Sequence, residues 1–295
     1  MKTPRVLFIM GDWPNPSETF LMREMLALAR LGLDFEVLAT GTNRHGKLPA
    51  TFGELSGRVR FLPKVVSPES LVAEEVAVLT HPVRYVRTAM ELFEDVGFLS
   101  GVPMRLPAAV WVSRQVRAGS FTRVHAQFAS LPGAVGRVIA RWAGLPFSFS
   151  CHARDLYVAS VGLPRLVTEA DLIVTCTEYN RRYLVGKFPE AAGRVHRVYH
   201  GVEIPVETPE KRAGPTPLIL AVGRLVEKKG FAHLVSACKI LDRRGIQYRC
   251  EIVGSGPLRS ELVGRIKKEG LTSVELVGWC DPDEVRRKMT RAACT

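Results

Sequence analysis

Short apolar runs alternate with amphipathic stretches over nearly the whole chain. In the amphipathic stretches apolar residues recur every three to four positions, which is the period of a helix. This alternation is typical of βαβ units, in which a parallel sheet is covered by helices. The pattern predicts a first helix that begins at Ser17 and ends at Gly32. It predicts strands at 5–10, 35–39, 59–62, 123–126, 147–151, 172–176 and 195–199.

The alternation stops near residue 205 and then restarts. Prolines and charged residues fill 205–217, and neither the helix period nor the strand period survives there. We therefore predict an α/β domain at 1–204, a linker at 205–217 and a partial second α/β domain at 218–295. In the second domain the pattern predicts strands at 218–222, 247–253 and 274–277, and helices at 231–244, at 258–269 and from about 282. The chain stops at "RAACT", directly after a predicted helix, where a βαβ plan requires another strand.

Composition narrows the class of protein. The longest apolar runs, such as "VLFIM", are far shorter than the roughly 18 residues of a membrane span, and they are too short for a signal sequence. We therefore expect a cytoplasmic protein. The six cysteines form no C-x-x-C pair, so the spacing predicts neither a zinc knuckle nor a redox motif.

Charge points to an anionic partner. The chain has 41 Lys and Arg against 29 Asp and Glu, a net charge of +12. Nucleic acid, anionic lipid and phosphorylated small molecules are the candidates. Nucleic acid is disfavoured, because the sequence has no RNA-binding signature and no interleaving of aromatic and basic residues.

The stretch "AVGRLVEKKGF" predicts a phosphate site. A strand ends before Gly223, and the next helix begins near Gly230, so backbone N–H groups gather at the carboxyl edge of the sheet. Arg224 and Lys229 flank this helix start. The planar guanidinium of the arginine can bind two phosphate oxygens and the ammonium of the lysine one, which suits a diphosphate. The alternative is a solvated cluster of surface charges. A second glycine turn, "GSGP" at 254–257, follows the next strand, although such turns are common connections and are weak signals alone.

Two further segments carry candidate chemistry at strand ends. In "SCHARDLY", His152 and Asp155 follow an apolar strand, at a spacing that lets a carboxylate orient an imidazole. The alternative is a helix-capping His with an acidic residue in the first turn. The loop "GDWPNPSETF" follows the first strand and leads into a helix N-terminus, which also favours anions.

Taken in order, "PSETF", "HAQFA", "SCHARDLY", "YHGVE", "GRLVEKKGF" and "GSGPL" resemble the retaining GT-B glycosyltransferases of the group one, or family four, type. The first segments are most similar to the exopolysaccharide branch, which includes colanic-acid-type enzymes. The resemblance implies an α/β fold with two Rossmann-like domains facing across a cleft. The first domain would take the acceptor and the second a nucleotide sugar. The implied reaction moves a sugar from a nucleotide-diphosphate sugar to a saccharide or lipid-linked saccharide, in exopolysaccharide or cell-envelope glycan synthesis.

The resemblance also assigns roles to residues of this chain. His152 and Asp155 would be catalytic, and Arg224, Lys229 and Gly11 would contact the donor diphosphate. The implied donor-nucleotide residues are Gly254, Gly256, Val277 and Gly278. The implied acceptor residues are Ser17, Glu18, Thr19, Phe20 and His125. The family generally needs no metal, and the sequence has no D-x-D to hold one, so we expect neither a metal nor a cofactor.

Two positions depart from the family pattern. Gln127 stands where relatives often carry the second His of an H-x-H pair. The family's E-x7-E motif has no counterpart up to Thr295, so the resemblance implies a C-terminally truncated second domain and a chain of low or no transferase activity. A non-catalytic phosphate- or saccharide-binding remnant is therefore the alternative function. A dehydrogenase is disfavoured because no G-x-G-x-x-G follows the first strand.

The amphipathic segment 85–93 and the net charge of the chain suggest peripheral contact with an anionic membrane. The alternative is an ordinary helix whose apolar side faces the core.

Overall fold

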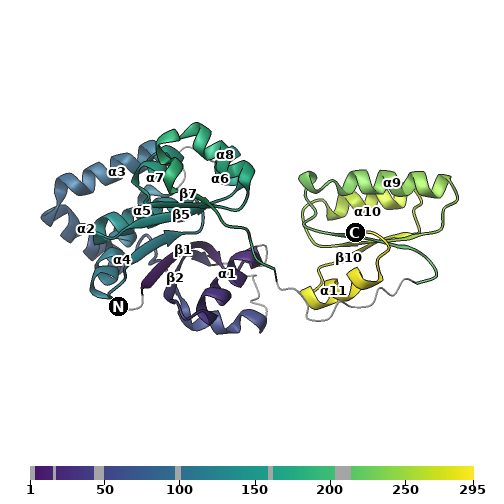
Figure 1. Cartoon of the computed structure of the whole chain (residues 1–295), viewed down its shortest axis with the longest axis horizontal. Helices are drawn as coiled ribbons and strands as arrows, with labels where there is room; N and C mark the ends of the chain where they lie inside the picture. The colour runs from purple at the N-terminus through teal and green to yellow at the C-terminus, as the bar shows by residue number, and fades with distance from the viewer. Residues whose placement is uncertain (1–3, 16–17, 43–49, 97–100, 159–161, 203–213) are drawn as a thin grey trace. The chain divides into compact units, whose positions relative to one another are not determined.

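The computed structural model describes residues 4–15, 18–42, 50–96, 101–158, 162–202 and 214–295. The chain divides into two compact units, Met1–Glu203 and Ile204–Thr295. Most of the predicted linker, 205–217, lies outside the described residues. Each unit is an α/β layer structure around a parallel sheet, and the two are described separately (Figure 1).

Unit 1 contains a seven-stranded parallel sheet in the order β3-β2-β1-β4-β5-β6-β7. Its strands are β1 (Arg5–Trp13), β2 (Asp34–Thr42), β3 (Val59–Phe61), β4 (Arg123–Ala126), β5 (Phe147–Cys151), β6 (Leu172–Thr175) and β7 (Val195–Arg197). The predictions for β4 and β5 are correct to the residue. β1 continues three residues past the predicted end at Met10, whereas β6 and β7 end one and two residues early.

Helices cover both faces of this sheet (Figure 1). The strand period explains why: along β1, Leu7 and Ile9 belong to one core cluster, while Phe8 and Met10 belong to another on the opposite face. The helix α1 (Thr19–Arg30) and the 3₁₀ segment η2 (Ala50–Arg58) cover the second cluster. The remaining helices of the unit are α2 (Pro68–Thr80), α3 (Pro82–Val96), α4 (Leu106–Ala118), α5 (Leu131–Ala143), α6 (Ala153–Tyr157), α7 (Leu163–Glu169) and α8 (Glu178–Lys187). Two short 3₁₀ helices are η4 (Pro103–Arg105) and η5 (Pro189–Arg194).

The predicted start of the first helix needs a correction. Ser17 lies outside the described residues, and the residue before α1 is Glu18. The end agrees with the prediction, because Gly32 follows the helix with a left-handed φ of +82°.

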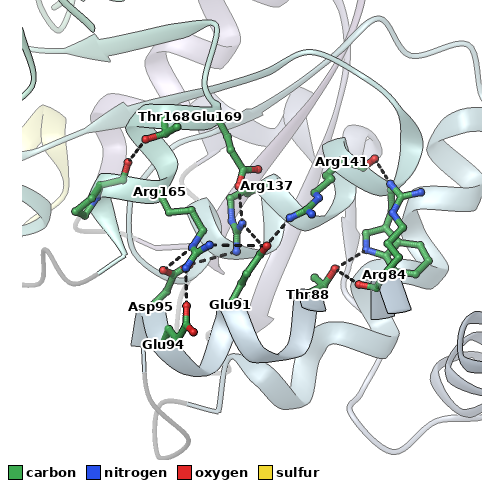
Figure 2. Close-up of polar contacts among 12 residues, drawn as sticks. Arg84, Thr88, Glu91, Glu94, Asp95, Arg137, Arg141, Arg165, Thr168 and Glu169 are labelled. Atoms are coloured by element: carbon green, nitrogen blue, oxygen red, sulfur yellow. Dashed lines mark hydrogen bonds and ion pairs between the residues drawn. The ribbon is translucent and has the colours of Figure 1, made fainter. Parts of the chain in front are cut away.

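A buried ionic network fastens α3 to α5 and α7 (Figure 2). Arg137 on α5, with 1% of its side chain exposed, binds Glu91 and Asp95 on α3 at 3.1 and 3.2 Å and Glu169 on α7 at 2.8 Å. Burial alone would raise the pKa of Glu91, but hydrogen bonds and charge from Arg137 and Arg141 lower it overall. The network therefore holds the Glu91 carboxylate ionised inside the unit.

Unit 2 contains a three-stranded parallel sheet in the order β10-β9-β8. The elements are β8 (Leu218–Val222), the 3₁₀ turn η6 (Glu227–Lys229), α9 (Phe231–Arg243), β9 (Arg249–Val253), α10 (Arg259–Lys268), β10 (Val274–Gly278) and α11 (Pro282–Arg291). The two helices α9 and α10 lie on one face of the sheet and α11 lies on the other (Figure 1). The helix predicted at 231–244 is confirmed, and Phe231, Val235 and Cys238 lie on its buried side.

The expectation that the chain stops directly after a helix is wrong. Residues after α11 return to the sheet, where Cys294 forms a parallel bridge with Ile219 of β8. The backbone N–H of Leu220 donates to the carbonyl of Cys294 at 3.0 Å. This contact partly covers the outer edge of β8.

Candidate functional site

Three polar side chains meet at the carboxyl edge of the unit 1 sheet. His152 follows β5, Cys176 follows β6, and His200 lies three residues after β7. Because adjacent parallel strands end at the same edge, these residues come together although 24 positions or more separate each pair. One ligating atom from each lies within 4.8 Å of the others.

The same edge borders a cavity of about 310 Å³. On one side α1 contributes Arg23 and Glu24, and the strand ends supply the other side. Burial raises the pKa of Glu24, although its interaction with Gln127 opposes the shift. The residues after the strands that line the cavity are Ser150, His152, Cys176, Tyr199, His200 and Gly201.

Aromatic rings fix the imidazole of His152. Phe20 and Phe128 meet it edge-on, with centroids 5.3 and 5.1 Å away, and the ring of His200 lies 5.2 Å away. Burial and then the neighbouring His200 lower the pKa of His152 to about 4, against a smaller effect of the Gln127 backbone. His152 is therefore neutral at pH 7. Within the part of the chain that the structure describes, its buried Nε2 has no hydrogen-bond partner.

The prediction that the Asp155 carboxylate orients the imidazole of His152 needs a correction, while its catalytic role stays a prediction. Its Oδ2 accepts a hydrogen bond of 2.9 Å from the backbone N–H of His152, so the bond goes to the backbone and not to the imidazole. Asp155 is itself buried, and burial raises its pKa while backbone N–H groups lower it. The residue fixes the turn that carries His152, which is the helix-capping alternative of the sequence analysis.

His125, a predicted acceptor residue, lies in the interior of the sheet. Its Nδ1 and Nε2 are 2.9 and 3.0 Å from the hydroxyls of Ser148 and Ser150. Burial lowers the pKa of His125 to about 4, with a smaller effect of Arg123. Both ring nitrogens are thus engaged within the sheet, and Ser150, rather than His125, lines the cavity.

The other predicted acceptor residues lie at the start of α1, except Ser17, which is outside the described residues. Glu18 precedes the helix and Thr19 is its first residue. Phe20 contacts both His152 and His200, with a centroid distance of 4.3 Å to the second. Gly11 lies within β1, and a β-carbon there would meet open space.

In unit 2 the two glycine turns pack directly against each other. The N–H of Gly223 donates to the carbonyl of Val253, and the N–H of Leu225 donates to the carbonyl of Ser255. A β-carbon on Gly254 would lie 1.9 Å from the Gly223 carbonyl oxygen, and one on Gly256 would lie 2.5 Å from that of Leu225. Only glycine allows this approach, so the turn after β9 supports the turn after β8.

The predicted phosphate residues lie on this supported turn. Arg224 and Lys229 are both exposed; Arg224 precedes η6, and Lys229 is its last residue, just before α9. The stem of Lys229 comes within 3.9 Å of where a β-carbon on Gly223 would be. Gly230 precedes α9 with a left-handed φ of +70°. The turn therefore presents two cations beside a helix N-terminus.

Val277 and Gly278 end β10 beside these turns. The carbonyl of Gly278 accepts a hydrogen bond of 2.6 Å from the N–H of Gly254, and Val277 packs on the core under α11. The predicted nucleotide residues therefore lie side by side at one sheet edge.

The sequence reasoning missed Glu24, Cys176 and His200. A signal for two of them was present, because Cys176 is the last residue of a predicted strand and His200 directly follows another, as His152 does. Glu24 gave no such signal, because its position in the middle of α1 looks like an ordinary helical polar residue.

Two family models match the chain. Residues 17–204 match "Glycosyltransferase Family 4", and residues 207–295 match "Glycosyl transferases group 1". The amylovoran biosynthesis glycosyltransferase AmsK of Erwinia amylovora is 24% identical over 98% of this chain and 74% of its own length. AmsD of the same organism is 30% identical over 44% of this chain, and the match spans 36% of AmsD.

Solved structures agree in fold. The pneumococcal O-GlcNAc transferase GtfA, solved in complex with UDP and GlcNAc, matches 95% of this chain and 77% of its own. The TM-score is 0.64 at 12% sequence identity. The fold is the α/β GT-B glycosyltransferase fold predicted from the sequence.

Proposed function

Because the chain belongs to the family 4, group 1 glycosyltransferases, we propose that it transfers a sugar from a nucleotide-diphosphate sugar to a saccharide or lipid-linked saccharide acceptor. We further propose that the anomeric configuration is retained and that the product belongs to an exopolysaccharide or cell-envelope glycan. The names of AmsK and AmsD support the polysaccharide part. The family matches favour this enzyme over a non-catalytic remnant.

One observation carries the proposal: the neutral imidazole of His152 borders a cavity large enough for a sugar. Its Nε2 has no hydrogen-bond partner among the described residues. Phe20 and Phe128 hold its ring, and Asp155 fixes its backbone. A neutral ring so placed can hydrogen-bond a hydroxyl of the transferred sugar without adding positive charge beside the forming oxocarbenium ion. His152 is the catalytic residue under this proposal.

Unit 2 would hold the donor diphosphate on the turn after β8. Arg224 offers a bidentate fork and Lys229 a point charge, and each charge-assisted hydrogen bond contributes roughly 1.5–3 kcal/mol. The same cations would stabilise the nucleoside diphosphate as it leaves. Since they can neutralise the leaving group, we propose that the transfer itself needs no metal ion.

The test is nucleotide-dependent thermal stability of the purified chain, measured with UDP, GDP, ADP and their sugars. A ligand that binds only the folded state at 100 times its Kd adds about 2.7 kcal/mol, which raises the melting temperature. We expect a shift with one base that is lost in the Arg224→Ala, Lys229→Ala double variant. The matched control is Arg243→Ala, Arg244→Ala, which removes two exposed cations of the same unit and should keep the shift.

No shift with any nucleotide, in a chain that unfolds cooperatively, would contradict the donor assignment. A shift that survives the Arg224 and Lys229 substitutions would place the diphosphate elsewhere.

We also propose a peripheral membrane contact through the outer side of α3. The inner side of α3 buries Tyr85 and Leu92 in the core beside the ion-paired Glu91 and Asp95. The helix nevertheless has a second apolar side, on which Val83, Val86 and Met90 are 75%, 57% and 58% exposed. None of the described helices is long and apolar enough to cross a membrane. An exposed apolar stripe on a chain of net charge +12 suits shallow insertion into an anionic leaflet.

Flotation with vesicles of phosphatidylcholine, with and without phosphatidylglycerol, tests this contact. We expect binding to the anionic vesicles that falls at least tenfold in Val86→Ser, Met90→Ser. The control Val263→Ser removes an exposed apolar side chain of unit 2 and should change nothing. Equal binding by the α3 variant and the unchanged chain would refute the surface.

A further inference from the structure

The strand-end cluster of unit 1 has the chemistry of a metal site. A thiol and two imidazoles converge from three separate elements, the residues after β5, β6 and β7, with ligating atoms within 4.8 Å of one another. Sulfur and imidazole nitrogen are the ligands of zinc-class transition metals, whereas calcium and magnesium prefer oxygen.

We propose that His152, Cys176 and His200 bind a zinc-class divalent ion with three protein ligands and one open position. Zinc–nitrogen bonds of about 2.0–2.1 Å and zinc–sulfur bonds of about 2.3 Å place tetrahedral ligands about 3.5 Å apart. The three atoms therefore need to close by about 1 Å, which is within reach of side-chain rotation.

Two observations favour this closure. The buried Nε2 of His152 lacks a hydrogen-bond partner among the described residues, so a metal ion would satisfy an atom that is otherwise unengaged. His200 is exposed and follows the last strand of the sheet, so its ring can adjust with little disturbance of the core. The cavity beside the three residues leaves room for a water molecule as the fourth ligand.

Binding converts the Cys176 thiol to a thiolate, and the proton passes to solvent. The metal ion would occupy the His152 ring that the proposed transfer reaction uses, so it is an inhibitor of that reaction and not its cofactor. The inference does not rest on the proposed function, because metal binding is measured without any sugar substrate.

The experiment is a titration of the purified 295-residue chain with Co²⁺, followed by competition with Zn²⁺. We expect one equivalent of Co²⁺ with the charge-transfer absorption of a cobalt–thiolate bond, and we expect Zn²⁺ to displace it. Cys176→Ser should abolish the charge-transfer absorption. Cys294→Ser, which removes an exposed thiol of unit 2, should leave it unchanged.

His200→Asn provides a second variant that is expected to fold, because His200 is exposed. It should raise the Kd for Zn²⁺ at least tenfold, since one of three protein ligands is lost. The proposal is overturned if Co²⁺ binding does not saturate, if the absorption persists in Cys176→Ser, or if His200→Asn binds Zn²⁺ as tightly as the unchanged chain. Because metal content and nucleotide shifts are read separately, failure here leaves the transferase proposal standing.

Discussion

The candidate sites of the two units differ in what forms them. In unit 1 the site consists of side chains, and burial of the His152 ring among neighbouring rings lowers its pKa to about 4. In unit 2 it consists of backbone, two glycine turns in contact, with Arg224 and Lys229 exposed at the rim. A side-chain site can change its chemistry through burial, whereas a backbone site depends on the absence of β-carbons.

The supports differ in the same way. Unit 1 holds α3 in place with buried charges around Arg137, and unit 2 holds its turns with hydrogen bonds between main chains. The units should therefore be destabilised by different substitutions, and changes at four positions test that contrast.

The largest effect is expected for Arg137→Met. The substitution leaves Glu91, Asp95 and Glu169 without the cation at their centre, although Arg141 and Arg165 still contact part of the network. Breaking a buried ion pair by removing one partner costs about 3–5 kcal/mol. Urea unfolding of the chain measures this loss. Arg182→Met removes an exposed pair with Glu178 and should cost about 1 kcal/mol or less, so equal losses in the two variants would refute the importance of burial.

Next comes Gly254→Ala in unit 2. The new β-carbon would lie 1.9 Å from the Gly223 oxygen at a φ of +144°, so both turns must move. Overpacking and strained backbone together cost about 3 kcal/mol. Gly264→Ala is the matched control, because it lies within α10 with nothing within 4 Å and should stabilise by about 0.5–1 kcal/mol. A Gly254→Ala chain that unfolds at the same urea concentration as the unchanged chain would show that the turns do not touch.

A smaller effect is expected from pH through His125. Its pKa is lowered from 6.5 to about 4 by burial, so between these values the unfolded chain binds a proton that the folded chain does not. Stability should therefore fall as pH drops from about 6.5 towards 4, by about 2 kcal/mol between pH 7 and pH 5. In His125→Asn this part of the pH dependence should disappear when urea unfolding is compared at the two values. An unchanged slope would mean that other groups carry it.

The sequence predicted the strands that are buried on both faces, and it predicted the glycine turns, because apolar runs and glycines are local signals. β4, β5 and β8 were placed to the residue. The meeting of Cys176 with His152 and His200 required the strand order, which no local pattern contains. The same holds for Asp155, whose carboxylate was predicted to orient the imidazole and instead binds the backbone N–H of His152. The helix α3 was only half predicted, because its period does not reveal that it has apolar residues both on the buried side, such as Leu92, and on the exposed side, such as Val86.

The smallest effect separates two uses of glycine within unit 2. Gly230 has a left-handed φ of +70°, but a β-carbon there meets nothing closer than 3.8 Å, so only the backbone conformation matters. Gly230→Ala should cost about 1–2 kcal/mol, and Gly230→Asn less, because Asn tolerates the left-handed region. Urea unfolding of both variants beside Gly254→Ala tests the order. If Gly230→Asn destabilised the chain as much as Gly254→Ala, the backbone conformation of these glycines, and not their close approach to a neighbouring turn, would explain why the site needs glycine.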